Sequence, residues 1–521
     1  MPGADASAQP VLVLIMLRQI YSVSSLIFAT IFLLLGNGMF MSLLALRGRY
    51  EGFGDHVLGI MSSIYFIGFL LGGYIVPRIV RRMGHIRAFA FFASSLAVFV
   101  LLHSLIIDIH FWMVIRLLTG ISIVGFYTVI ESWFNGATQP GSRAQLFAVY
   151  MMAEMFSNAL AQQMLRLAPV ENFTLFAIAA IMVCLSVMPV TATRLPQPVV
   201  NNMSHLTVRR MWKAAPIGVF GALAAGMTNG TLWTMGALYG KKMGLDTAHV
   251  AILMSTIIIG GAVLQLPLGR LSDFIDRRKA LAVAVCGGMI AAVGMMLLEN
   301  YYRPMLVAAF LYGGMVFCIY SIALAHLMDH LEPQDMMAGS AGFLLLYGVG
   351  AIIGPAVAGT LMDRLGALAF PAFFAIVLML LFCFIWLTMR RKKQDEIVAE
   401  QAQFIPMIRT AAPSVEITVA IEEHRLESTG DSTVDNMAAD NTTENAAEDA
   451  AVADAADSDQ PPQPDDSATM TITAADEHTA AAAGDTNNAG EITADHAPGT
   501  PDTAPDAERS SPQDEETTKP K

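Results

Sequence analysis

The sequence predicts an all-α integral membrane protein with twelve transmembrane helices in two pseudo-symmetric six-helix halves, followed by a disordered acidic C-terminal tail. Three observations predict this fold. The 521-residue chain is 55% hydrophobic and only 14% charged, with a mean hydropathy of +0.53. Its apolar runs are close to the ~20 residues that cross a bilayer. Short motifs also recur at a spacing of 192 or 193 residues.

Apolar runs that are separated by turn or charge signals give the positions of the helices. The N-terminus is small and polar and shows no signal-peptide cleavage site, so we expect the first helix to remain in the mature protein. The predicted helices span residues 21–46, 57–76, 88–107, 111–133, 145–165, 173–192, 215–239, 248–268, 280–298, 304–328, 339–361 and 367–389.

Basic residues predict the orientation of these helices. An even number of crossings places both termini on one side, and Lys and Arg are enriched in cytoplasmic segments. With both termini inside, the cytoplasmic segments hold 18 Lys and Arg, whereas the outer segments hold 7. We therefore expect a multi-pass protein of the plasma (inner) membrane with both termini in the cytoplasm.

The two halves of the membrane region share sequence. Residues 37–48 match residues 229–240 with five identities. Such an internal repeat is typical of transporters whose substrate site lies between the repeats. The predicted domains are therefore an N-terminal bundle, a cytoplasmic linker, a C-terminal bundle and a tail, at residues 1–192, 193–214, 215–393 and 394–521.

The tail carries the acidity of the whole chain. Residues 394–521 hold 29 of the 44 acidic residues and 5 of the 31 Lys and Arg. This composition cannot bury enough apolar surface to fold alone. The net charge of -13 is thus no guide to the substrate.

Motifs for catalysis are missing from the sequence. The four cysteines lie in apolar runs without metal-ligand spacing. We find no phosphate-binding loop, nucleophile elbow or nucleic-acid motif. We expect no enzyme activity, no cofactor, no metal and no nucleic-acid partner.

Glu154 is the candidate proton-coupling residue. An acidic residue in the hydrocarbon zone costs a few kcal/mol and often marks a transport pathway. Burial favours the protonated carboxyl, which can bind and release a proton. The alternative is a neutral carboxyl that Asn158 holds as packing between helices. A polar stripe at four-residue spacing comprises Tyr150, Glu154, Asn158 and Gln162.

Other candidate cavity residues are Arg116, Asn37 and Asn229. Arg116 can contact substrate, or it can bond backbone carbonyls and a partner carboxylate as scaffold. The two asparagines occupy repeat-equivalent positions beside glycine. They can line a central site, or they can bond one helix to another.

A charged loop at Gly269, Asp273, Arg277 and Arg278 joins two predicted helices. Glycine suits a tight turn, and the basic run suits the cytoplasmic surface. Asp273 and Arg277 can form a cluster with Glu131 and Arg143 that latches the halves on the inside. As solvated surface charges they would contribute little.

This loop resembles a signature of the major facilitator superfamily, G-x-x-x-D-x-x-G-R-[RK]. Gly269, Asp273, Arg277 and Arg278 match it, and Asp276 stands where the family has glycine. Arg116-Leu-Leu-Thr-Gly120 is similar to the family's intramembrane arginine motif. Residues 350–359 are similar to the Gly-Pro motif of its antiporters, and residues 131–133 and 331–334 resemble an uncharacterised bacterial branch.

The resemblance and the residues together indicate a secondary active transporter that works by alternating access. We expect proton-coupled export of an apolar, neutral or cationic small molecule by a monomer in the lipid bilayer. Few fixed positive charges lie in the predicted cavity helices, which disfavours a multiply anionic substrate. The alternatives are proton-coupled uptake of a small metabolite, and a transporter-fold receptor or scaffold that displays the acidic tail.

Overall fold

The structure is a computed structural model that describes residues 8–137, 143–192 and 207–391. All regular secondary structure in these ranges is α-helical. The predicted acidic tail, 394–521, and most of the predicted linker lie outside the described residues.

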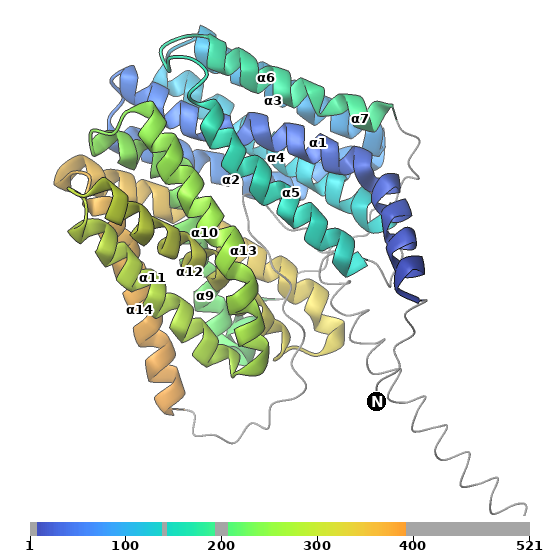
Figure 1. Cartoon of the computed structure of the whole chain (residues 1–521), viewed down its shortest axis with the longest axis vertical. Helices are drawn as coiled ribbons and strands as arrows, with labels where there is room; N and C mark the ends of the chain where they lie inside the picture. Colours follow the sequence, from blue (N-terminus) through green and yellow to red (C-terminus); the bar gives the residue numbers. More distant parts are fainter. Residues whose placement is uncertain (1–7, 138–142, 193–206, 392–521) are drawn as a thin grey trace, which may run out of the picture. The chain divides into compact units, whose positions relative to one another are not determined.

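The first half of the chain forms the helices that Figure 1 colours from blue to blue-green. Within this half, α2 packs against α4, α1 packs against α5 and α6, and α3 packs against α4 and α6. The bounds are α1 Ala8–Tyr50, α2 Asp55–Met83, α3 His85–Leu105, α4 Ile109–Ala137, α5 Arg143–Met164, α6 Thr174–Leu185 and α7 Val187–Thr191.

The second half repeats this packing in the helices coloured from green to orange in Figure 1. Here α10 packs against α12, α9 packs against α13, and α11 packs against α12 and α14. The bounds are α8 Val208–Ala214, α9 Pro216–Lys242, α10 Thr247–Phe274, α11 Arg277–Leu297, α12 Tyr302–Met328, α13 Pro333–Leu365 and α14 Ala369–Arg391. Across the two halves, α2 contacts α13, α5 contacts α10 and α1 contacts α9.

Several helix boundaries differ from the predicted ones for clear physical reasons. The first helix begins at Ala8 instead of residue 21, because no helix breaker follows Pro10, which suits a first helical turn. The sixth predicted helix is interrupted at Ser186. Pro189 lacks an N–H and crowds the carbonyl four residues earlier, so the helix cannot run through unbroken. The short helix α8 occupies the last residues of the predicted linker.

Glycines bring the helices together at the same repeat spacing as the sequence motifs. A Cβ on Gly68 of α2 would overlap the carbonyl oxygen of Leu117 on α4. A Cβ on Gly260 of α10, 192 residues later, would overlap the carbonyl oxygen of Phe310 on α12. Close approach of this kind through small residues is the usual way that membrane helices associate. The internal repeat is therefore a repeat of helix contacts.

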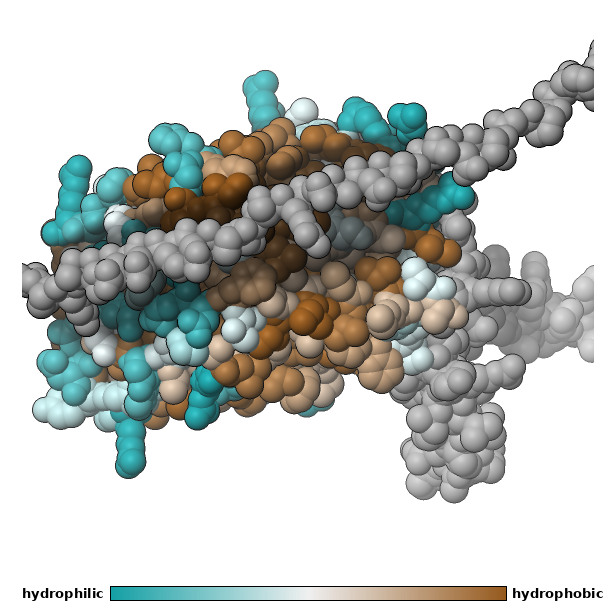
Figure 2. Space-filling model, turned by 90° about the horizontal axis from the view of Figure 1, so that it is seen from above, coloured by the Kyte–Doolittle hydropathy of each residue, from teal (hydrophilic) through white to brown (hydrophobic). Residues whose placement is uncertain are grey.

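The surface of the helices suits a lipid environment. Ten helices of the described residues are long and apolar enough to cross a membrane. Helices α5 and α9 fill two further predicted positions but are not among these ten; the described part of α5 carries a carboxyl and several amides. Figure 2 shows hydrophobic residues over the middle of the visible face and hydrophilic residues near its margins. Large exposed side chains include Phe28, Phe156, Ile290 and Leu380.

Candidate functional site

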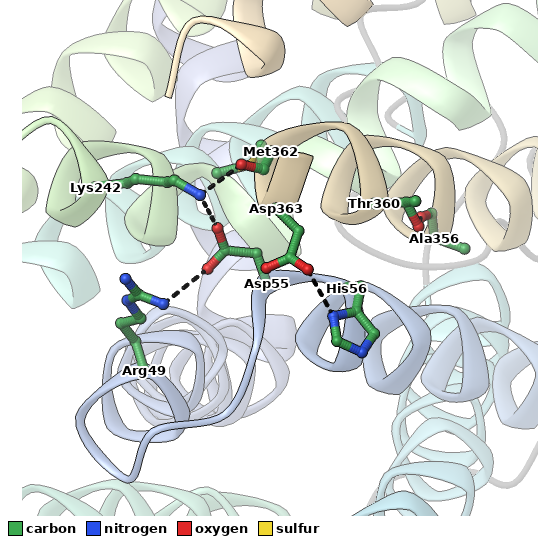
Figure 3. Close-up of polar contacts among 8 residues, drawn as sticks. All are labelled: Arg49, Asp55, His56, Lys242, Ala356, Thr360, Met362 and Asp363. Atoms are coloured by element: carbon green, nitrogen blue, oxygen red, sulfur yellow. Dashed lines mark hydrogen bonds and ion pairs between the residues drawn. The ribbon is translucent and has the colours of Figure 1, made fainter. Parts of the chain in front are cut away.

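A cluster of charged residues joins the two halves where α1 ends and α2 begins (Figure 3). Asp55 from the first half has no exposed side-chain surface and pairs with Lys242 from the second half. The Lys242 ammonium group also donates to the backbone oxygen of Met362 on α13. Arg49 Nη1 lies 3.5 Å from the other Asp55 carboxylate oxygen. We call Arg49, Asp55, His56, Lys242 and Asp363 the latch.

His56 and Asp363 form the outer part of the latch. The imidazole Nδ1 lies 2.9 Å from Asp363 Oδ2, and both side chains are about half exposed, at 49% and 41%. The pair therefore joins α2 to α13 at the solvent-facing edge of the buried Asp55 pair. Together the two pairs form one polar contact between the halves.

Local sequence explains how the latch is built. Gly52 has a φ of 83°, a left-handed conformation that glycine adopts without strain, and it reverses the chain after α1. Asp55 then lies in the first turn of α2, where the helix dipole favours a negative charge. Lys242 lies in the last turn of α9, where the dipole favours a positive charge.

The carboxylate at the start of α10, the helix that corresponds to α2 in the repeat, has a different role. Asp246 caps α10 and accepts a hydrogen bond from the backbone N–H of His249 at 2.7 Å. This bond, together with the hydrogen bond from the His249 side chain, lowers the pKa of Asp246 below its usual value. Both Asp246 and His249 belong to the second half, so this carboxylate supports its own helix. The latch is therefore asymmetric although the fold is repeated.

Close backbone contacts reinforce the latch. A Cβ on Gly59 of α2 would overlap the carbonyl oxygen of Pro355 on α13. The Ser63 hydroxyl donates to the backbone oxygen of Ile352, again on α13, at 2.5 Å. On the other side, the Gln163 amide donates to Ser255 Oγ at 2.8 Å, which joins α5 to α10. This end of the protein, the latch end, is closed.

Buried polar groups lie on α1 and α9 farther from the latch end. Among the described residues, Asn37 Oδ1 and both amide atoms of Asn229 have no hydrogen-bond partner. Thr231 Oγ1 and Trp233 Nε1 are likewise unpaired there. A buried polar group without a partner costs about 1–3 kcal/mol. A ligand that supplies hydrogen bonds to these groups can recover that cost.

Arg116 is a buried guanidinium surrounded by soft and aromatic groups. It is 2% exposed, and its Nη1 lies 3.5 Å from Met41 Sδ. Its guanidinium carbon lies 4.8 Å from the ring centre of Tyr65 and 6.0 Å from that of Phe40. Cation–π contacts stabilise a desolvated cation. Within the described residues no carboxylate pairs with Arg116, so the predicted scaffold partner is replaced by ring faces.

The polar stripe of α5 divides into two parts. Gln162 accepts from Ser42 Oγ at 2.7 Å and donates to the backbone oxygen of Gly38 at 3.2 Å. It therefore bonds α5 to α1. The Asn158 amide donates to the backbone oxygen of Glu154 at 2.9 Å and not to its carboxyl group. Glu154 and Tyr150 are both buried.

The charged loop residues lie at the opposite ends of α10 and α11 from the latch. Arg277 is buried and donates from Nε to Asp329 at 2.6 Å, and its Nη1 lies 3.6 Å from Asp273. All three residues belong to the second half. Asp276, at the position of the family glycine, caps α11 by accepting from the Arg278 N–H at 2.8 Å.

Three predicted residues remain: Gly269 of the charged loop, and Glu131 and Arg143, which were predicted to form a cluster with Asp273 and Arg277. Gly269 does not form the predicted tight turn, because it lies inside α10 (Thr247–Phe274). It is buried, and its carbonyl oxygen accepts from Ser272 Oγ at 2.8 Å. Glu131 is buried as well, whereas the side chain of Arg143 lies outside the described residues. The predicted inner cluster of these residues with Asp273 and Arg277 thus stays a prediction.

Sequence reasoning missed the latch. Arg49 and Lys242 entered only the count of basic residues in outer segments, and Asp55 was not singled out. The available signal was an acidic residue that follows a Gly52-x-Gly54 turn, in a protein whose outer segments also carry Lys and Arg. Which of those basic residues meets Asp55 depends on how the halves pack.

Comparisons with known proteins agree on one family. A model of the Major Facilitator Superfamily matches residues 218–426. An uncharacterized MFS-type transporter, Ent638_1421, of Enterobacter sp. (strain 638) is 27% identical over 313 residues, which are 59% of this chain and 80% of the relative.

Solved structures show the same fold at low sequence identity. The nucleoside transporter NupG aligns with a TM-score of 0.58 and 12% identity, over 72% of this chain and 100% of that chain. A bacterial homolog of the human lysosomal transporter Spinster, inward-facing and unoccupied, aligns with a TM-score of 0.56 and 13% identity, over 71% and 95%. At these identities the likeness concerns the fold alone.

Proposed function

Because the chain belongs to the major facilitator superfamily, in a bacterial branch of uncharacterised transporters, we propose that it exports a small molecule in exchange for protons by alternating access. The chain is a multi-pass membrane protein whose apolar helices contact the lipid bilayer. The proposal adds a direction, a coupling ion and a substrate that is apolar, neutral or cationic. We further propose that the protein acts as a monomer in the inner membrane.

The latch is the observation that best supports alternating access. Its ion pairs and short side-chain hydrogen bonds join the halves at one end, and such polar contacts can break and re-form when the halves rock. With the termini in the cytoplasm, as the basic residues predict, the latch end faces outward. In that orientation the latch would close the outer end, which is one of the two closures that alternating access requires.

Glu154 supports proton coupling. The residue is 3% exposed and lies near the middle of α5, a helix that contacts the second half through α10. A proton taken up on the outer side and released on the inner side would drive exchange, provided that the substrate and the proton occupy the site around Glu154 in turn.

The decisive variant is Glu154→Gln, which keeps the shape of the side chain and removes its titration. We expect it to lower pH-driven transport at least about tenfold while the protein still folds, because no proton can be exchanged at that position. The measurement is uptake of a panel of apolar, neutral and cationic compounds into proteoliposomes of the full chain with an imposed pH gradient.

The matched control is Glu171→Gln, which removes a carboxylate from an exposed position after α5. Its transport should equal that of the unchanged protein. Normal pH-driven flux in Glu154→Gln would return Glu154 to a packing role. Substrate flux that runs inward together with the proton would favour the alternative function, proton-coupled uptake, over export.

A receptor or scaffold that displays the acidic tail is the second candidate. The buried carboxyl of Glu154 argues against it, since a scaffold has no use for an acid at that depth. The unpaired Asn37 Oδ1 and the two unpaired amide atoms of Asn229 argue in the same direction, because a ligand inside the bundle could supply their hydrogen bonds.

A further inference from the structure

A crevice opens between the halves along α5 and α10. Its volume is about 660 Å³, within the range of pockets that hold drug-sized molecules. Met152 and Phe156 at its mouth are 70% and 64% exposed, whereas Met155 and Ile258 at its inner wall are buried. The crevice therefore runs from the lipid-facing surface into the contact between the halves.

Hydrogen bonds close the crevice on the side of the latch end. Ser255 Oγ donates to the backbone oxygen of Ala159 at 2.8 Å, and Gln163 donates to Ser255. Beyond these contacts α10 packs closely on α12 through Gly260 and Gly261. With the orientation that the basic residues predict, the open part lies in the cytoplasmic half of the bilayer.

The chemistry of the lining selects a lipophilic ligand. Side chains of Met, Ile, Leu, Ala and Phe make up most of the wall, its polar members are Ser255, Gln163 and Gln265, and no lining residue carries a charge. Methionine sulfur is polarisable and makes favourable contacts with aromatic rings. An uncharged aromatic compound that already partitions into the membrane fits this wall better than a hydrated ion does.

We infer that this crevice is a lateral entry and binding site through which an uncharged, aromatic, lipophilic substrate passes from the cytoplasmic leaflet into the transporter. The inference rests on the proposed export function and names the class of substrate and its route. Hydrocarbon is the solvent around the mouth, so such a substrate reaches the crevice without crossing water. Met155 lies next to Glu154 in α5, so a substrate seated at the inner wall lies within one helical turn of the candidate proton site.

The test measures binding and not transport. Full-chain protein in lipid nanodiscs is titrated with N-phenyl-1-naphthylamine, an uncharged aromatic probe that fluoresces in apolar surroundings, and the signal of empty nanodiscs is subtracted. The change is Ala262→Trp, which places a bulky ring in the crevice wall on α10. We expect saturable binding to the unchanged protein and at least about tenfold weaker binding to this variant.

The matched control is Ile290→Trp on α11, which adds the same ring at an exposed, lipid-facing position and should leave binding unchanged. If Ala262→Trp does not fold, Ala159→Phe fills the crevice from α5. Equal binding in all variants, or no saturable binding to the unchanged protein, overturns the inference. A bound phospholipid detected by native mass spectrometry in place of the probe overturns it as well.

The outcome is separable from that of the proposed function. Pumping of water-soluble compounds that depends on Glu154, together with failed probe binding, would refute the crevice alone. Probe binding that depends on the crevice, together with unchanged flux in Glu154→Gln, would refute proton coupling alone.

Discussion

Lys242 is the residue that distinguishes the latch from an ordinary surface charge. It is 17% exposed and pairs with a carboxylate that is fully buried. Removal of one partner from a buried ion pair costs about 3–5 kcal/mol, and Arg49 compensates for part of this. We therefore expect Lys242→Met to shift the protein toward forms that are open at the latch end.

The measurement is labelling of Ser63→Cys, in a variant without the four native cysteines, by a membrane-impermeant maleimide. Ser63 is buried between α2 and α13, so its labelling rate should rise several-fold in Lys242→Met. Lys241→Met, at the exposed neighbouring lysine, is the control and should not change the rate. Identical rates in all three proteins would mean that the latch does not hold this end closed.

At this scale the sequence predicts which residues are unusual but not what they contact. An acid, an arginine and amides in apolar helices are conspicuous, and all of them are buried in the structure. Their roles depend on rotations about the helix axes that periodicity leaves open by tens of degrees. Gln162 faces α1 and has a hydrogen bond at each of its two polar atoms, whereas Asn229, which looks equally polar in the sequence, has none among the described residues.

Glycine contacts control the packing of whole helices. We expect Gly68→Ala to destabilise the protein by about 1–3 kcal/mol, because the new methyl group meets the carbonyl oxygen of Leu117 and pushes α2 away from α4. The comparison is Gly73→Ala in the same helix, where a Cβ meets nothing within 4 Å. That change should leave stability equal or raise it by up to about 1 kcal/mol, since alanine favours helix. Thermal unfolding of the purified variants decides, and equal melting temperatures would contradict the argument.

The positions of helices could be predicted because hydrocarbon permits few alternatives to a helix for a spanning segment. The ends could not be predicted as well. The long start of α1 has no charge pattern that marks it, and the break at Ser186 depends on a proline that many membrane helices tolerate. The close helix contacts at Gly68 and Gly260 were not predicted either, because the sequence repeat was recognised from other residues.

On the scale of the whole molecule, the acidic tail and the helices differ sharply in charge. Residues 394–521 carry a net charge of -24, from 29 acidic and 5 basic residues, whereas the latch, the amides and the crevice all lie between residues 24 and 391. We expect deletion of residues 394–521 to leave pH-driven transport within about twofold of the full chain. Lost cellular function with intact transport in proteoliposomes would instead favour the scaffold role.

Because the latch consists of a buried and an exposed pair, salt should affect its two parts differently. Counter-ions screen charges beyond about 10 Å at 0.1 M salt and beyond about 3 Å at 1 M, and they act on exposed pairs much more than on buried ones. The His56–Asp363 pair is open to the medium, while Asp55 is sealed from it. High salt should therefore weaken the exposed His56–Asp363 pair and leave the buried Asp55–Lys242 pair intact. In the orientation that the basic residues predict, the buried pair would therefore keep this end closed over a wide range of outer salt concentrations.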